Sequence, residues 1–270
     1  MWAVARAVRL DQYGAMQFHL GPHSRRTTLR ITLPDTAAAL AAVQARLEAE
    51  QGFALATLNL DHLVKLSHDV AFQDAYAAHD MVTADGNPVV WLSRIARRPV
   101  ELVPGADLVL PLARIAAKVG AGVALVGSTQ NALDRASANL QGQVPGLSIV
   151  HRAAPPMGFD PSGPEAQAVL DAVAASGARL CFLALGAPRQ ERLAALGRTV
   201  APRVGFVSVG AAIDFLAGTQ SRAPAWVQRM ALEWLWRLLS DPGRLAGRYL
   251  RCALILPGHV WRAWRLPRRD

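Results

Sequence analysis

The chain alternates short apolar runs with segments of helical periodicity, and this alternation limits its fold more than any other feature. Most of the apolar runs lack the polar–apolar alternation of a half-exposed sheet. Strands buried on both faces indicate a parallel sheet, so we predict an α/β fold with a Rossmann-like, open, mostly parallel sheet and helices on both faces. The predicted strands are residues 28–33, 53–59, 81–84, 122–127, 147–151, 179–185 and 203–209, and the predicted helices are 36–50, 62–78, 106–119, 132–141, 165–176 and 189–196.

The composition changes abruptly near residues 218–224. Residues 220–270 carry ten arginines against three acidic residues and hold five of the seven tryptophans, which gives this part +7 of the total net charge of +9. We therefore divide the chain into an α/β catalytic domain, 1–219, and a basic, Trp-rich helical appendage, 220–270. Arginine and tryptophan interleaved with leucine are typical of a helix that lies on a membrane surface.

Two other interpretations of the basic appendage remain open. It could be an ordinary C-terminal helix with solvated arginines, or it could bind nucleic acid. The stripe Trp226, Met230, Trp234 and Leu238 favours a lipid surface over nucleic acid. The start of the chain resembles no signal peptide, no apolar run reaches the roughly 20 residues of a membrane span, and Cys181 and Cys252 indicate no disulfide framework. We expect a cytoplasmic protein, peripheral on the inner face of the cell membrane.

Polar or small residues follow five of the predicted strands. Ligands of open α/β sheets bind at the carboxyl ends of the strands, so these positions indicate a site for a polar, phosphorylated ligand. Turns and helix caps also need such residues, and each signal is weak by itself. The residues at the five exits are Thr57 and Asn59, Asp85, Gly127, Gln190, and Asp214.

Individual positions differ in how strongly they point to function. Asp85 could be a turn aspartate instead of a functional residue. The Gly127 loop could hold a diphosphate at a helix N-terminus, although it matches neither a Walker A loop nor GxGxxG. Asp214 stands in an otherwise apolar run, so its carboxylate must be hydrogen-bonded or face a cavity. No DxD, HExxH or Cys/His cluster occurs, and we predict neither a metal site nor a cofactor.

Taken in order, these motifs resemble the WecG/TagA/CpsF family of bacterial glycosyltransferases over roughly residues 28–251. The order and spacing of the motifs are far more specific than any one of them. The matching elements are Thr57-x-Asn59, Ala84-Asp85-Gly86, Pro104-Gly105-x-Asp107, the Gly127 loop, Gly186-x-Pro188-Arg189-Gln190-Glu191, Gly210-x3-Asp214-Phe215, Arg222-Ala223-Pro224-x-Trp226, Glu233-Trp234-x2-Arg237, and Pro242 with Arg244.

The resemblance implies a membrane-associated, metal-independent, inverting glycosyltransferase. Such enzymes move a sugar from a UDP-sugar to a monosaccharide on a polyprenyl diphosphate, in exopolysaccharide or cell-envelope polysaccharide synthesis. It implies that Asp85 is the general base and that Thr57 and Asn59 border the sugar pocket. Further implied roles are uridine binding by Gln190 and Asp214, stacking on uracil by Phe159, and contact with the lipid diphosphate by Arg237, Arg244 and Arg248.

One position departs from the family pattern. Family members commonly carry an arginine where this chain has Leu102, so the charge of the departing UDP must be met elsewhere, by Arg189 or by arginines of the appendage. Two alternative functions stay open: a Rossmann-type nucleotide-dependent oxidoreductase, which lacks its fingerprint here, and a non-catalytic membrane adaptor. The sequence leaves the donor sugar, the acceptor and the formation of a homo-oligomer open.

Overall fold

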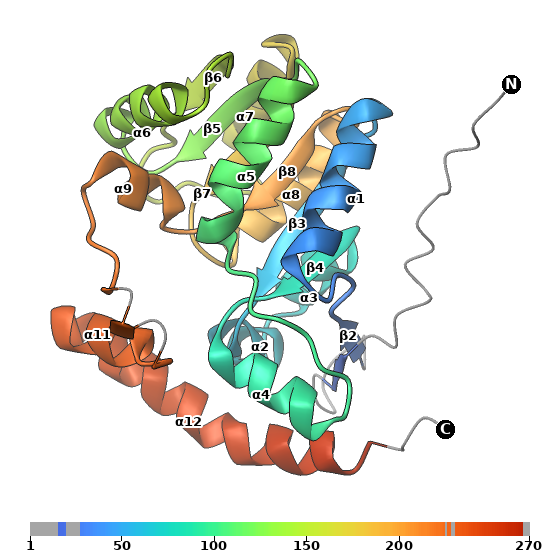
Figure 1. Cartoon of the computed structure of the whole chain (residues 1–270), viewed down its shortest axis with the longest axis vertical. Coiled ribbons are helices and arrows are strands. Elements are labelled where there is room, and N and C mark those ends of the chain that lie inside the picture. Colours follow the sequence, from blue (N-terminus) through green and yellow to red (C-terminus); the bar gives the residue numbers. More distant parts are fainter. Residues whose placement is uncertain (1–15, 20–27, 225, 228–229, 267–270) are drawn as a thin grey trace, which may run out of the picture.

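The computed structural model of the protein describes residues 16–19, 28–224, 226–227 and 230–266. Its centre is a six-stranded parallel sheet in the order β4-β3-β8-β7-β5-β6, with helices on both faces (Figure 1). The predicted α/β class is thus confirmed. The strands of this sheet are β3 (Phe53–Leu58), β4 (Met81–Ala84), β5 (Gly122–Gly127), β6 (Ile149–Ala153), β7 (Ala178–Ala184) and β8 (Gly205–Ser208).

Both faces of the central strands are covered, which explains their unbroken apolar sequences. Phe182 of β7 lies in a core cluster with helices α1 and α5, and its neighbour Cys181 lies in the opposite cluster with α7 and α8. Successive residues of a strand point to opposite faces, so each face receives every second side chain. The helices on these faces are α1 (Thr36–Glu48), α5 (Gly105–Lys118), α6 (Gln130–Gln143), α7 (Pro164–Ala175), α8 (Arg189–Val200) and α9 (Ala212–Ala217).

The first predicted strand, 28–33, is not part of the parallel sheet. Only β2 (Thr28–Arg30) is a strand, and it pairs antiparallel with β1 (Gln17–His19) in a separate two-stranded sheet. The next residues run beside β4 without a ladder, because Thr32 and Leu33 both donate backbone N–H groups to the carbonyl of Val82. Pro34 then follows and cannot donate to a strand partner.

The predicted helix 62–78 is two helices, α2 (Leu60–Leu66) and α3 (Val70–Ala77). The helix is interrupted between them because Asp69 caps the start of α3. Its Oδ1 accepts a hydrogen bond from the N–H of Phe72 at 2.9 Å. Helix α4 (Asn87–Ile95), which follows β4, was not predicted. It starts with Pro88 at its first turn, a position that tolerates proline because the lost N–H has no helical partner.

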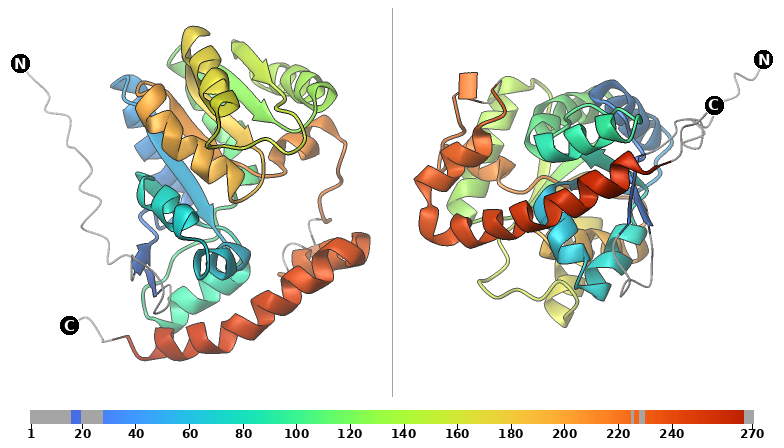
Figure 2. Two further views of the ribbon diagram at one scale, coloured as in Figure 1. Left: turned by 180° about the vertical axis from the view of Figure 1, so that it is seen from behind. Right: turned by 90° about the horizontal axis from the view of Figure 1, so that it is seen from below.

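The appendage forms helices α11 (Glu233–Ser240) and α12 (Pro242–Trp264). Helix α12 packs against α2 and α4, the two helices that begin directly after β3 and β4. It therefore lies across the side of the molecule at which these strands end, and seen from below it crosses the whole underside (Figure 2). The predicted helical appendage is present; its membrane association and its separation as a domain stay predictions.

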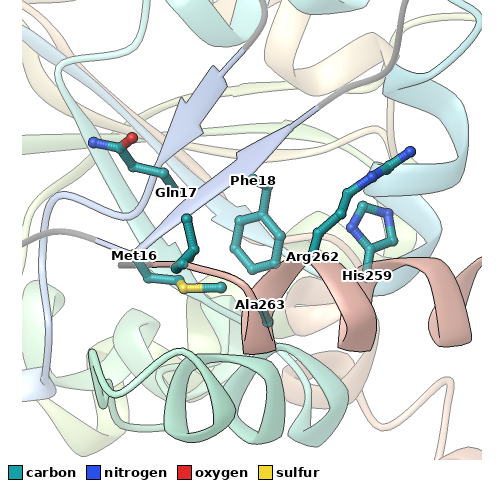
Figure 3. A pocket seen from close by; sticks show the side chains of 7 residues that line it. Met16, Gln17, Phe18, His259, Arg262 and Ala263 are labelled. Atoms are coloured by element: carbon teal, nitrogen blue, oxygen red, sulfur yellow. The ribbon is translucent and has the colours of Figure 1, made fainter. Parts of the chain in front are cut away.

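The far end of α12 is held by the N-terminal strand. The side chains of Met16, Phe18, His259 and Ala263 line a pocket between β1 and α12 (Figure 3). The rings of Phe18 and His259 meet edge to face with centroids 6.2 Å apart. Met16 and Phe18 are both 2% exposed, so the β1–β2 sheet and the end of α12 share one apolar cluster. Among the described helices, none is long and apolar enough to cross a bilayer.

Candidate active site

Three predicted site residues lie together at the carboxyl ends of β3 and β4. They are Thr57, Asn59 and Asp85. Thr57 donates its hydroxyl to Oδ2 of Asp85 at 3.4 Å, and the backbone N–H of Asp85 donates to the carbonyl of Leu58 at 2.7 Å. Asn59 caps α2, with its Oδ1 accepting from the N–H of His62 at 3.0 Å. Gly86 turns the chain beside Asn59 with φ of 110°, a conformation that favours glycine. The parallel pairing of β3 and β4 creates this juxtaposition.

The carboxyl group of Asp85 is partly buried and has a raised pKa. Burial raises its pKa to about 6; the guanidinium of Arg237 acts in the opposite direction, and the carboxylates of Glu233 and Asp107 add to the rise. A carboxylate with a pKa near 6 is ionised at neutral pH, yet basic enough to accept a proton from an alcohol in a transition state. Asp85 therefore has the properties of a general base.

Charged groups of the appendage lie within electrostatic reach of this carboxyl group. Arg237 of α11 donates to Glu233 at 2.6 Å, and its guanidinium lies 5.8 Å from the ring centroid of Phe215 in α9. Arg222 forms an ion pair with Asp107 in the first turn of α5. Hydrogen bonding and charge attraction from Asp107 raise the pKa of Arg222, and Asp85 contributes to the same rise. The exit of β4 is thus within electrostatic reach of two appendage arginines.

The exits of β5 and β8 meet at a second pair of residues. Ser128, which follows β5, donates its hydroxyl to Oδ1 of Asp214 at 2.5 Å. Asp214 is therefore hydrogen-bonded, as its apolar surroundings required. Gly127 adopts φ of 118°, and a Cβ there would lie 2.4 Å from the carbonyl oxygen of Ala184. The loop from β5 into α6 can follow this path only with glycine at 127.

Gln190 joins the exits of β7 and β8. Its Oε1 accepts from the backbone N–H groups of Gly186 and Gly210, both at 3.2 Å, and its Nε2 donates to Glu191 at 2.8 Å. The side chain is 3% exposed, so its polar atoms serve the two loops. Its contact with a uridine stays a prediction.

The remaining predicted residues lie in different surroundings. Phe159 is 3% exposed in the apolar cluster of α7 and α8, and stacking on uracil, still a prediction, would require the ring to leave that cluster. Arg248 pairs with Oδ2 of Asp61 in α2 at 3.1 Å, which directs it toward the body. Arg244 lies in α12, but its side chain is outside the described residues. Contact of these arginines with a lipid diphosphate stays a prediction.

Sequence reasoning gave no role to several residues that the fold brings to the site. Asp107, Arg222 and Glu233 stood in the matched motifs, but their pairing depends on how the appendage folds back. Ser128 had a detectable signal, since it stands between a strand-ending glycine and the helix cap Thr129. In the part of the chain that the structure describes, no group of three or more His, Cys, Asp or Glu residues could hold a metal ion.

The sequence model of the glycosyl transferase WecG/TagA/CpsF family matches residues 26–270, nearly the whole chain. The chain belongs to the WecG/TagA/CpsF family of glycosyl transferases.

Proposed function

We propose that the protein is an inverting, metal-independent glycosyltransferase that moves a hexose or N-acetylhexosamine from a UDP-sugar to a polyprenyl-diphosphate-linked sugar. The reaction would serve exopolysaccharide or cell-envelope polysaccharide synthesis. The observation that carries the proposal is Asp85: a partly buried carboxyl group with a pKa near 6, at a strand exit, beside Thr57 and within the field of Arg237. Family membership favours this function over an oxidoreductase or an adaptor.

The chemistry follows from the proton and charge that such a transfer moves. Asp85 would accept the proton of the acceptor hydroxyl as its oxygen attacks the anomeric carbon from the side opposite the leaving group. UDP departs as an anion, whose charge backbone N–H groups and arginines can stabilise. Since this chain has Leu102 where relatives commonly carry arginine, we assign that task to Arg237, which is the cation that acts most strongly on Asp85.

Helix α12 supports the membrane part of the proposal. Leu250, Leu254, Trp261 and Trp264 share the face that points away from the body and are 53–71% exposed, whereas Cys252 and Ala263 on the opposite face are buried. Arg265 places its guanidinium 4.0 Å from the ring centroid of Trp261. An apolar face bordered by arginines suits an anionic lipid surface, on which a peripheral, cytoplasmic enzyme would meet a lipid-linked acceptor.

A ligand screen on the full-length protein tests the donor class. UDP present at 100 times its dissociation constant should stabilise the native state by about 2.7 kcal/mol, which a thermal-unfolding measurement resolves. Stabilisation by NAD and not by UDP would contradict the proposal and favour the oxidoreductase. Mass spectrometry with a panel of UDP-sugars and synthetic polyprenyl diphosphate sugars would then identify the transferred sugar and its acceptor.

The pH dependence of the transfer tests the base. A pKa of about 6 means that Asp85 is ionised above pH 6 and progressively protonated below it, so the rate at saturating donor should fall about tenfold per pH unit below 6. Arg237 lowers this pKa, so Arg237→Gln should move the inflection to higher pH. A rate that stays constant from pH 7.5 to pH 5 would exclude Asp85 as the base.

A further inference from the structure

Lys65 occupies a junction between α2 and the exit of β7. It is one of only two lysines among 29 cationic residues. Its Nζ forms an ion pair with Asp61 at 2.7 Å and donates to the carbonyl of Ala187 at 3.1 Å. Ala187 lies in the loop 186–188, whose first residue is held on the other side by Gln190. An ammonium carries three donors and can therefore bind a helix and a loop at once.

The carboxylate of Asp61 is shared with the appendage. Asp61 is 7% exposed, and its Oδ2 also pairs with Arg248 of α12 at 3.1 Å. A buried carboxylate needs its cations, because removal of one partner leaves a charge that water cannot solvate. Arg248, Asp61, Lys65 and Ala187 thus form a continuous polar chain from α12 to the β7 exit.

Glu191 adds a second polar link at the same loop. It is fully buried, and burial raises its pKa to about 7, while its hydrogen bond from Gln190 and the charge of Lys65 act in the opposite direction. The same carboxyl group accepts from Gln190, which binds the N–H groups of Gly186 and Gly210. Lys65 therefore contacts the loop directly through Ala187, and its charge also lowers the pKa of Glu191 beside the loop.

We infer that Lys65 and Asp61 are positioning residues that couple the docking of α12 to the conformation of the loop 186–188. The inference rests on the proposed function for its consequence, since this loop borders the region proposed for the donor. Arg248 pairs with Asp61, so the polar route from Arg248 to the loop runs through Asp61 and Lys65. Ala187 also packs against the apolar cluster that contains Cys252 of α12, and the substitutions below change only the polar route. The appendage would then do more than bind a surface, because its docking sets the geometry of the β7 exit.

Hydrogen exchange in the full-length protein tests the coupling without any ligand. Arg248→Met and Lys65→Met should each accelerate exchange of a peptide covering residues 186–190 about fivefold or more, the lower end of usual coupling strengths. The double variant should exceed Lys65→Met alone by little, because both changes interrupt one chain of contacts. Arg248→Lys should restore slow exchange. Unchanged exchange in Arg248→Met, or fully additive effects, would overturn the inference.

Two further measurements distinguish a failure of this inference from a failure of the proposed function. One uses a control arginine of α12 that does not pair with Asp61, and the other measures UDP affinity. Arg251 is exposed on the next turn of α12, and Arg251→Met should leave exchange of the 186–190 peptide unchanged. UDP affinity should fall about 5- to 50-fold in Arg248→Met and Lys65→Met. If the unaltered protein binds no UDP but Arg248→Met still accelerates loop exchange, the proposed donor is wrong and the coupling holds. If UDP binds and exchange does not respond, the coupling is wrong and the function holds.

Discussion

Asp85→Asn should lower the rate of sugar transfer by about 10²- to 10⁴-fold, the usual contribution of a general base. Asparagine keeps the size of the side chain and an acceptor for the hydroxyl of Thr57, but it cannot take a proton from the acceptor alcohol. UDP affinity should change little, because the expected nucleotide contacts lie at the exits of β5, β7 and β8. Steady-state rates with UDP titrations on the same variant measure both quantities. A variant with full activity would show that Asp85 is not the base.

The same substitution should leave the protein at least as stable as before. The pKa of Asp85 in the folded protein, about 6, lies above its ordinary value of 3.8, so its ionisation destabilises the native state as pH rises through this interval. At pH 7.5 asparagine removes that cost, and the midpoint of thermal unfolding should not fall. Asp74→Asn, the same change at an exposed position of α3, is the control and should retain full activity.

Replacing the exposed face of α12 should release the protein from membranes. The variant carries glutamine at Leu250, Leu254, Trp261 and Trp264, all more than half exposed. Because full burial of one such side chain contributes roughly 1.5–3 kcal/mol, partitioning onto anionic lipid vesicles should fall at least about 100-fold. Sedimentation of the full-length protein with vesicles measures this loss. Undiminished sedimentation would show that this face is not the anchor.

The control for that variant uses exposed apolar residues elsewhere. Val150→Gln with Met157→Gln removes two such side chains near β6, at 39% and 103% exposure, and should leave vesicle binding intact. Deletion of residues 220–270 is a poorer test. It would remove Cys252 and Ala263 from the cluster that covers Phe18 and would leave Asp61 without Arg248. A lost activity could then reflect unfolding.

The parallel sheet was predictable because its strands are buried on both faces. Val123 to Val126 of β5 show the reason: each side chain enters one of two cores, so the whole run is apolar. The separate β1–β2 sheet was not predictable, since Gln17–His19 and Thr28–Arg30 are three residues each and too short to show a period. The sequence analysis did not predict helix α4, because the order of apolar and polar residues in its nine residues fits the period of a helix as well as that of a strand.

The part of the candidate site that lies at the carboxyl ends of the strands was predictable from the sequence. The part that forms when the appendage packs onto the α/β body was not. Thr57, Asn59 and Asp85 follow neighbouring strands, so the parallel register brings them together. Gln190 lies in the first turn of α8 and Phe159 lies between β6 and α7, and no periodicity shows which neighbouring segments bury their side chains. Likewise, the ion pairs of Arg222 and Arg248 span 115 and 187 residues of sequence, with Asp107 and Asp61 as partners. Local patterns contain no information about such distant partners.

The position of α12 has a consequence for how such an enzyme would encounter its substrate. One face of the helix rests on α2 and α4, and the other faces outward, so a single helix thickness separates those helices from whatever the outward face touches. For an enzyme docked through that face, the acceptor search is confined to a plane. Turnover would then scale with the number of acceptors per unit area of bilayer, and diluting the lipid carrier among inert phospholipids would slow the enzyme even at constant bulk concentration.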